Sequence, residues 1–483
     1  MKRKYLELRK KISAYNFALG TISFDAETIA PKDAFKYRAS MVTVLDSERL
    51  NIIKSDEYFN IVESLTKEEL DPTLNREIEL QYKSLLKNKF VPKEMLLEFS
   101  TLSQNSAQNW ELAREKNDFD IFKDSLNELI KLIKKITKIQ ANNGDMYDFI
   151  LDDFEEGYSK ERYDIFFNKV KEEIIPLINE VKSTDGIDFA FSKKNQREFI
   201  EYLIEVIGFD LNKGYLSESI HPFTAHTQTN DVRLTVAYDD TLESIFSAFH
   251  ELGHAMYEQN INPNLNGTFL ESGVSPGIHE SQSRFYENII GRSKAFWSVH
   301  LKKLQELFPE LELYSLDEFY NRLNVVKKSL IRVAADEMTY PVHILIRYEV
   351  EKYIFSDEFD IDNLKMMWND LHEKYLGIRP TNDLEGILQD IHWSWGYFGY
   401  FPTYALGSAI SAQIYYTSSI DINNLVENDK IAEVNEFLKE KIHKYGCLKT
   451  PSEIIKNVSG EDFNADYYVK YLKDKYTRRI IWN

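Results

Sequence analysis

Residues 126–133 read LNELIKLI, and the fold prediction starts from this stretch. Leu126, Leu129, Ile130 and Ile133 recur at the i, i+3, i+4, i+7 spacing of one helix face, while lysines and acids occupy the other face. Similar patterns run from residue 1 to about residue 208 and resume after about residue 240. Because the 483 residues include only 18 glycines and 12 prolines, long helices are rarely interrupted. The sequence therefore predicts a mainly α-helical protein.

The helical patterns continue without an obvious domain boundary. No internal repeat, low-complexity tract or linker divides the chain, so we expect one large helical domain over residues 1–483, either undivided or bilobed. Within it we distinguish a helical N-terminal part, residues 1–208, from a catalytic part, residues 209–483, which holds most of the chemically suggestive residues.

Bulk properties exclude several classes of partner. The net charge of −19 disfavours binding to nucleic acid and to anionic membranes. No stretch approaches 18 apolar residues, so no transmembrane helix is predicted. The single cysteine, Cys447, allows no intrachain disulfide, which fits a reducing compartment. No histidine stands within residues 444–448, so a thiol nucleophile is disfavoured.

The sequence changes character at about residue 214. Residues 231–238 alternate between polar and apolar side chains, which is typical of a strand, and we expect a small antiparallel sheet in this region. An edge strand of such a sheet commonly pairs with an extended peptide. Asp240 and Glu243 have the spacing of a capping box, so we expect the next helix to begin near Thr241.

That next helix carries the strongest local motif, His250-Glu251-Leu252-Gly253-His254. Four-residue spacing puts both imidazoles on one helix face, where they can bind one zinc ion, and Glu251 can reach a water on that metal. The alternative is two surface histidines beside a solvated glutamate. Apolar neighbours would bury the helix, however, and buried histidines need partners. We therefore favour a metal site.

A catalytic zinc ion takes three protein ligands and leaves one position for water. We choose Glu280 as the third ligand because it begins a second helix after a loop rich in glycine and proline, 26 residues beyond His254. His279 is the competing candidate. A His-His-Glu site has a net charge near +1, which helps to acidify a bound water. Such a site also accepts Co²⁺ or Mn²⁺.

Six ordered motifs resemble the carboxypeptidase Taq family of metallocarboxypeptidases, and together they extend over most of the chain. A seventh stretch, Phe24 to Thr28 with Pro31, resembles the family's N-terminal region, with Phe24 where tryptophan is expected. The six motifs are His221-Pro222-Phe223, Asp231-Val232-Arg233-Leu234-Thr235, His250 to His254, His279 to Ser283, Ile331 to Asp336 and Gly386 to Trp393.

This resemblance implies a mostly helical fold with a deep central cleft, a divalent metal at the floor of the cleft and the small sheet beside it. Residues 1–208 would then form one wall of the cleft. The resemblance also implies a cytoplasmic homodimer that acts on peptides with a free C-terminus. In many proteins of the wider group, which includes angiotensin-converting enzyme, an aspartate follows the ligand glutamate by four residues. Arg284 stands there in this chain, so the residues that support the histidines must come from elsewhere.

The expected reaction follows from these residues. Glu251 takes a proton from the zinc-bound water as general base and returns it to the leaving amine. Tyr404 is the favoured donor to the developing oxyanion, with His392 and Tyr400 as rivals. This assignment rests on the family, because most of the 29 tyrosines are expected to pack in the core.

A carboxypeptidase must also bind the free carboxylate of its substrate, and an arginine does so with two parallel donors. Arg332 is the first candidate for this role, and Arg233 is the second. The alternative is that each forms a structural ion pair, Arg332 with Asp336 one helical turn away and Arg233 with Asp231. His221 either contacts the substrate or braces the cleft.

The sequence thus predicts a zinc carboxypeptidase that hydrolyses the C-terminal peptide bond. An endo-oligopeptidase or a dipeptidyl carboxypeptidase would use the same metal without a carboxylate anchor beside it. A catalytically silent helical binding protein is the remaining alternative, which the presence of every candidate ligand disfavours.

Overall fold

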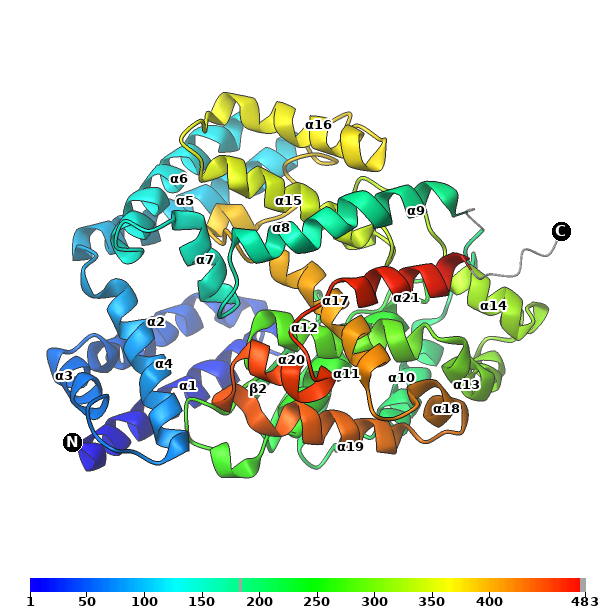
Figure 1. Cartoon of the computed structure of the whole chain (residues 1–483), viewed down its shortest axis with the longest axis horizontal. Coiled ribbons are helices and arrows are strands. Elements are labelled where there is room, and N and C mark those ends of the chain that lie inside the picture. The colour runs from blue at the N-terminus through cyan, green and yellow to red at the C-terminus, as the bar shows by residue number, and fades with distance from the viewer. Residues whose placement is uncertain (182–184, 478–483) are drawn as a thin grey trace. The chain divides into compact units, whose positions relative to one another are not determined.

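The computed structural model describes residues 1–181 and 185–477, and helices make up most of it (Figure 1). The chain divides into two compact units, each assembled from three separate stretches. The first unit comprises Met1–Lys89, Asp188–Tyr320 and Thr417–Asp462, and the second comprises Phe90–Ile187, Asn321–Tyr416 and the segment from Phe463 onward. The predicted mainly α-helical class is confirmed, whereas the division at residue 208 and the deep cleft stay predictions.

The first unit contains the sheet and most of the α-helices of the described chain. One of them, α14, runs across the boundary into the second unit. These helices are α1 (Lys2–Thr28), α2 (Phe35–Ile53), α3 (Asp56–Leu65), α4 (Pro72–Lys89), α10 (Lys193–Ile207), α11 (Glu243–Gln259), α12 (Pro276–Arg284), α13 (Lys294–Leu307), α14 (Leu316–Leu323), α18 (Ile422–Glu427), α19 (Ile431–Lys441) and α20 (Pro451–Ser459).

The described residues of the second unit contain helices and loops but no strand. Its helix α6 contains the stretch from which the fold prediction began, and Leu126, Leu129, Ile130 and Ile133 are buried there as expected. The helices of this unit are α5 (Lys93–Lys116), α6 (Asp120–Gln140), α7 (Met146–Phe154), α8 (Lys160–Lys169), α9 (Ile175–Glu180), α15 (Tyr340–Ile354), α16 (Leu364–Leu376), α17 (Phe401–Thr417) and α21 (Asp466–Thr477).

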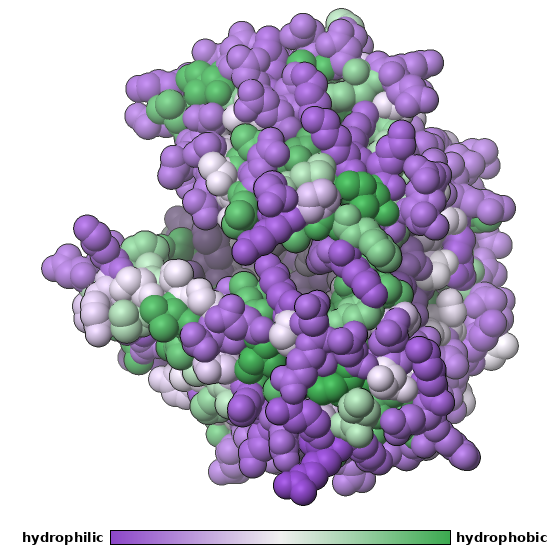
Figure 2. Space-filling view, turned by 90° about the vertical axis from the view of Figure 1, so that its left-hand side faces the viewer, coloured by the Kyte–Doolittle hydropathy of each residue, from purple (hydrophilic) through white to green (hydrophobic). Residues whose placement is uncertain are grey.

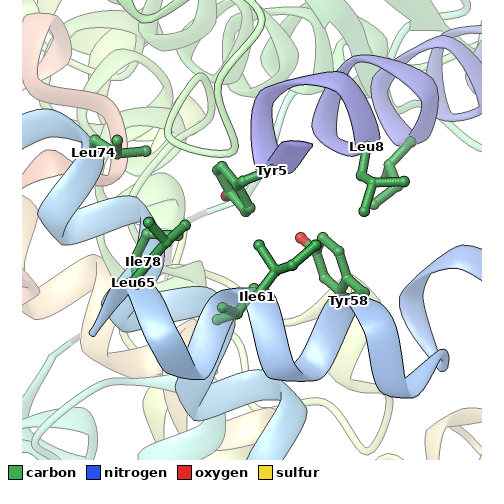
Figure 3. Packing of buried hydrophobic residues seen from close by; sticks show 9 residues of the cluster. Tyr5, Leu8, Tyr58, Ile61, Leu65, Leu74 and Ile78 are labelled. Atoms are coloured by element: carbon green, nitrogen blue, oxygen red, sulfur yellow. The ribbon is translucent and has the colours of Figure 1, made fainter. Parts of the chain in front are cut away.

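A hydrophobic cluster joins the N-terminal helices of the first unit (Figure 3). The rings of Tyr5 on α1 and Tyr58 on α3 stack with their centroids 6.1 Å apart, and both rings are fully buried. Burying each such side chain contributes about 1.5–3 kcal/mol before the entropic cost of ordering it. The other labelled members of the cluster are Leu8, Ile61, Leu65, Leu74 and Ile78.

The sheet consists of β1 (Gly214–Glu218), β2 (Thr224–Gln228) and β3 (Asp231–Val236) in the order β1-β3-β2. β2 and β3 pair in the predicted antiparallel sense. β1 and β3 are parallel, contrary to the expectation. β2 runs opposite to β1, and β3 turns back antiparallel to β2 into the place between them, so β3 runs in the same direction as β1. Alternate apolar side chains of β3 are buried, and α11 packs on this strand.

The start of α11 differs from its prediction. The helix begins at Glu243, and its N-cap residue Leu242 offers no side-chain hydrogen bond, so the expected capping box of Asp240 and Glu243 is wrong. The carboxylate of Asp239 instead accepts a hydrogen bond of 2.8 Å from the backbone N–H of Thr241. The chain is therefore turned one residue earlier than the sequence suggested.

Hydrophilic side chains prevail on the face drawn in Figure 2, with hydrophobic residues in small groups between them. Among the helices of residues 1–181 and 185–477, none combines the length and apolar character that crossing a membrane requires. The cytoplasmic location and the homodimer stay predictions.

Candidate metal centre

Two helices of the first unit bring three potential ligands together. His250 and His254 lie one turn apart on α11, and Glu280 lies on α12. The Oε2 atom of Glu280 is 3.5 Å from Nε2 of His250 and 3.6 Å from Nε2 of His254. The three ligand atoms all lie within 4.8 Å of one another. We call these three residues the metal cluster.

The spacing of the metal cluster fits a small divalent cation. Zinc binds histidine nitrogen and carboxylate oxygen at about 2.0–2.2 Å, so tetrahedral ligands lie roughly 3.3–3.6 Å apart. The separations of 3.5 and 3.6 Å between Glu280 and the two histidines agree with this range. The donor set of two imidazoles and a carboxylate also suits Zn²⁺, Co²⁺ or Mn²⁺. The residues present therefore fit a metal ion.

Gly253 allows the two helices to approach closely enough for this spacing. A Cβ atom at residue 253 would lie 2.6 Å from the carbonyl oxygen of Gln282 and 2.6 Å from Cα of Ser283. Both neighbours are backbone atoms of α12, which cannot yield as a flexible side chain does. Any larger residue at 253 would push α12, and Glu280 with it, away from the histidines.

Glu287 fixes the ring of His250. Its Oε2 atom lies 2.9 Å from Nδ1 of His250 and accepts a hydrogen bond of 3.1 Å from Arg284. Burial by itself would raise the pKa of Glu287, but the charge of Arg284 and the contact with His250 hold it at about 2. Arg284 also donates a hydrogen bond of 2.8 Å to Oε1 of Glu280. Arg284, which stands where many proteins of the wider group have an aspartate, therefore donates to the carboxylates of both Glu280 and Glu287.

His279 and Glu258 are connected to His254. Nδ1 of His279 lies 2.5 Å from Nδ1 of His254, and Nε2 of His279 lies 2.6 Å from Oε1 of Glu258. Burial and the neighbouring imidazoles of His279 and His250 lower the pKa of His254 well below its usual value, so its ring is neutral. Because both ring nitrogens of His279 have protein partners, His279 does not join the metal cluster as the alternative ligand.

Glu251 lies on the same helix, between the two histidines in sequence. Its side chain is buried, and Oε2 accepts a hydrogen bond of 2.7 Å from the hydroxyl of Thr224 on β2. Burial raises the pKa of Glu251, while His250 and the Thr224 hydroxyl oppose that rise. A buried carboxylate with a raised pKa is suited to accepting a proton near neutral pH. Thr224 was not among the predicted site residues.

The structure also places the other predicted residues of the first unit. Arg233 donates to Asp231 with Nε at 2.7 Å and Nη2 at 2.9 Å, so the alternative of a structural ion pair is confirmed for this residue. His221 is exposed, and its carbonyl oxygen accepts a hydrogen bond from Ser219.

Arg332 lies in the second unit, in a short 3₁₀ turn, Arg332–Ala334, and not in the helix that the sequence suggested. Its Nε and Nη2 donate to Oδ1 of Asp390 at 2.9 and 2.8 Å. The expected alternative, a pair with Asp336 across a helical turn, is therefore wrong. Asp336 accepts hydrogen bonds from backbone N–H groups, among them that of Thr339 at 3.0 Å.

Arg347 completes this buried group, and sequence reasoning missed it. Its Nε donates to Oδ2 of Asp390 at 2.7 Å, and its side chain is fully buried. One aspartate thus serves two arginines, and one positive charge remains in excess. We call Arg332, Arg347 and Asp390 the arginine cluster. Burial by itself would raise the pKa of Asp390, but the charges of Arg347 and Arg332 outweigh it and hold this pKa far below the usual range.

Tyr404 and His392, two of the three candidate oxyanion donors, lie in the same unit as the arginine cluster. Tyr404 and His392 are 3.5 Å apart between the hydroxyl oxygen and Nε2, and the guanidinium carbon of Arg332 lies 5.4 Å from the Tyr404 ring. Burial lowers the pKa of His392 to about 4. Three residues that the sequence proposed for substrate contact are therefore neighbours within the second unit.

Comparisons with known proteins agree with this arrangement. The profile of a family described as carboxypeptidase Taq (M32) metallopeptidase matches residues 4–476. Carboxypeptidase 1 of Bacillus subtilis is 40% identical, and Thermostable carboxypeptidase 1 of Pyrococcus furiosus is 34% identical, each over 98% of both chains. The crystal structure of the M32 carboxypeptidase from Deinococcus radiodurans R1 covers 98% of both chains at 29% identity with a TM-score of 0.94.

Proposed function

The chain belongs to the carboxypeptidase Taq (M32) family and is a metal-dependent carboxypeptidase, and on this premise we propose how its residues carry out the reaction. His250, His254 and Glu280 hold one divalent cation, preferably Zn²⁺, and Glu251 is the general base. The observation that carries the assignment is the metal cluster itself, three buried or half-buried ligands whose donor atoms lie within 4.8 Å of one another.

When bound there, a divalent cation supplies Lewis-acid chemistry, since it polarises a peptide carbonyl and lowers the pKa of a bound water to about 7. The lowered pKa of His254 keeps that ring unprotonated and so available to a cation. Glu280 adds a carboxylate ligand, and the hydrogen bond from Arg284 to its other oxygen orients this side chain. The resulting site carries a net charge near +1 and attracts the substrate carbonyl.

Glu251 moves the proton. It accepts a proton from the attacking water and later gives it to the amine of the departing C-terminal residue. The hydrogen bond from Thr224 fixes one carboxylate oxygen, and so leaves the other oxygen to exchange the proton. Burial favours the protonated form of Glu251 and therefore makes this carboxylate a stronger base than an exposed one.

The free carboxylate of the substrate is bound by an arginine, for which Arg332 remains the first candidate. The excess positive charge of the arginine cluster supports this choice, since Asp390 neutralises only one of two guanidinium groups. Arg233 is the second candidate, because Asp231 already occupies two of its three nitrogens. Tyr404 is proposed as the donor to the oxyanion, with His392 and Tyr400 as the alternatives, and His221 as a further substrate contact.

The proposal is tested with a peptide of about ten residues whose N-terminus is blocked, and the products are read by mass. Parallel reactions contain wild-type protein, wild type with a chelator, the chelated protein with Zn²⁺ or Co²⁺ restored, and Glu251→Gln. A matched control, Glu243→Gln, changes an exposed glutamate on the same helix that pairs with Arg292 at the surface.

We expect a ladder of single C-terminal losses from wild type and from Glu243→Gln. The ladder should disappear with the chelator, return with the metal, and slow by roughly 100- to 10,000-fold in Glu251→Gln. Internal cuts or paired losses would contradict the carboxylate anchor. An undiminished ladder from Glu251→Gln would contradict the assignment of the base, and persistence of the ladder under chelation would contradict the metal.

A further inference from the structure

Glu351 is a buried carboxylate of the second unit that belongs neither to the metal cluster nor to the arginine cluster. It lies on α15, and its side chain is fully buried. Its hydrogen bonds within the described residues come from three neutral donors: the Tyr147 hydroxyl at 2.8 Å, the Trp393 indole N–H at 2.7 Å and the backbone N–H of Gly399 at 2.8 Å. A carboxylate is costly to bury unless its oxygens accept hydrogen bonds, so these three contacts are what stabilises the charge there.

Two of these donors stand on either side of an irregular connection. Trp393 lies in the 3₁₀ turn His392–Trp395, and Gly399 stands just before α17. Residues 396–399, which we call the connecting segment, form neither a helix nor a strand. Since no regular hydrogen-bond ladder fixes this segment, a carboxylate that accepts a hydrogen bond from each side of it holds the turn and the start of the helix at a fixed separation.

The two elements that Glu351 connects carry candidate oxyanion donors. His392 precedes Trp393 in the 3₁₀ turn, and Tyr404 lies in the first turn of α17. Nε2 of His392 and the hydroxyl oxygen of Tyr404 are 3.5 Å apart, and their ring centroids are 6.3 Å apart. An oxyanion donor acts only when it lies about 2.7–3.1 Å from the developing charge. The separation between the turn and α17 therefore decides whether Tyr404 is in place.

The pattern of donors requires a carboxylate at residue 351. Trp393 donates to Oε1 of Glu351, whereas Tyr147 and Gly399 donate to Oε2. The indole and backbone N–H groups cannot accept hydrogen bonds, so both oxygens must be acceptors. In Glu351→Gln one of these acceptors becomes an NH₂ group, which would face either the indole N–H or the backbone N–H. This substitution therefore keeps the size of the side chain and releases one side of the connecting segment.

We propose that Glu351 is a positioning residue that holds the His392 turn against the start of α17 and so keeps Tyr404 in place as the oxyanion donor. The inference rests on the proposed function, in which Tyr404 has that role. It adds to that function a residue that lies outside both clusters and acts only through the segment that it holds.

The test is a double-mutant cycle on the zinc-loaded protein. Glu351→Gln, Tyr404→Phe and the double variant are compared with wild type by kcat and KM for release of the C-terminal residue from the blocked peptide. The matched control is Glu349→Gln, at a glutamate of the same helix that forms an ion pair with Lys171. Burial raises the pKa of Glu351 to about 7, so the assays are run at about pH 8.5, where this carboxylate is ionised.

We expect Tyr404→Phe to lower kcat by roughly 100- to 1,000-fold, as loss of one oxyanion donor does. Glu351→Gln should lower kcat by up to roughly 100-fold with little change in KM, because a displaced donor weakens binding of the transition state alone. In the Tyr404→Phe background the same substitution should cost far less, since the donor that it displaces is already gone. Glu349→Gln should match wild type in both constants.

Three outcomes would contradict these expectations. Equal losses of kcat from Glu351→Gln in the wild-type and Tyr404→Phe backgrounds would overturn the positioning role, because a merely structural defect lowers activity by the same factor in both. Wild-type kcat in Glu351→Gln would overturn it as well. Wild-type kcat in Tyr404→Phe would instead contradict the donor assigned in the proposed function, and the inference with it.

Trp393→Phe provides a second cycle that leaves Glu351 unchanged. It removes the indole N–H and keeps an aromatic ring, so the carboxylate loses its contact with the turn alone. We expect kcat to fall at unchanged KM, with little further loss in the Tyr404→Phe background. Zinc content and circular dichroism verify that each variant is folded. A loss of the same factor in both backgrounds would overturn the proposal.

Discussion

The metal cluster and the arginine cluster both bury ionisable groups, but the histidines in and beside them differ in the hydrogen bonding of their ring nitrogens. In the metal cluster, Nδ1 of each histidine has a side-chain hydrogen-bond partner, and Nε2 of each lies near Glu280. Beside the arginine cluster, His343 is fully buried, and neither of its ring nitrogens has a hydrogen-bond partner within the described residues. Burial and the nearby guanidinium of Arg347 lower the pKa of His343 well below its usual value.

This difference separates a ligand from a packing residue of the same type. An imidazole that is merely buried stays neutral and has no preferred tautomer. An imidazole that is buried with one nitrogen fixed and the other aimed at a carboxylate is prepared to bind a cation. The orientation of the nitrogens, more than burial, therefore identifies the candidate metal centre.

The largest expected contrast is between His250→Leu and His343→Leu. His250→Leu should lose the metal, and release of C-terminal residues should fall on the order of 1,000-fold or more, because Lewis-acid stabilisation is worth several kcal/mol. His343→Leu should bind Zn²⁺ as wild type does, since no polar contact of its ring is removed. Both are measured by metal content after dialysis and by peptide turnover. A metal-free His343→Leu protein would refute the distinction.

Asp390→Asn should have the next largest effect, and on stability. It leaves Arg332 and Arg347 without their shared counter-ion, and breaking a buried ion pair from one side typically costs about 3–5 kcal/mol. Urea unfolding should record this loss, while the dissociation constant for Zn²⁺ should not change. The conservative substitution Asp362→Asn, at an exposed aspartate paired with Lys123, should leave the free energy of unfolding nearly unaltered and serves as the control.

The free energy of unfolding should depend on pH through His372, a buried histidine of the second unit. Burial lowers its pKa to about 4, below the value near 6.5 expected in the unfolded chain. As the pH falls from about 6.5 to 4, the unfolded chain takes up this proton first, so the folded state loses up to about 3 kcal/mol. In His372→Leu, the unfolding free energy should therefore fall less than in wild type between these two pH values, by up to that amount. Parallel curves for variant and wild type would contradict the assignment.

Glu287→Gln should have the smallest effect of the four. The amide oxygen can still accept from Nδ1 of His250, but the charge that strengthens this contact is lost. We expect a loss of Zn²⁺ affinity towards the lower end of the roughly 10- to 100-fold range. Glu243→Gln, at the start of the same helix α11, provides the control in a competition titration. A tighter site in Glu287→Gln would argue against the supporting role of this carboxylate.

Local patterns in the sequence predicted the helices and the core of the site. The spacing from His250 to His254 requires only one helix, and Leu126 to Ile133 shows its buried face by period alone. Glu258 could also have been found in this way, because it lies one further turn along the same face. Glu280 was predicted because the loop rich in glycine and proline before α12 indicated that a second helix packs against the first.

Other residues were missed because their positions depend on nonlocal or irregular geometry. Glu287 lies in the π-helical segment Phe285–Gly291, where the spacing of three or four residues no longer predicts which side chains share a face. In the sequence, the feature that could have indicated the role of Glu287 is its charge among the mainly apolar residues 285–290. Asp390 meets Arg332 and Arg347 from distant parts of the chain, and the parallel pairing of β1 and β3 is likewise invisible to local alternation.

The central claim, that His250, His254 and Glu280 hold the catalytic metal, is tested most directly by anomalous X-ray scattering at the zinc edge from crystals grown with Zn²⁺. The account predicts one anomalous peak per chain, about 2.0–2.2 Å from Nε2 of both histidines and from Oε2 of Glu280. A strong peak at another site, with these three side chains left unliganded, would contradict it.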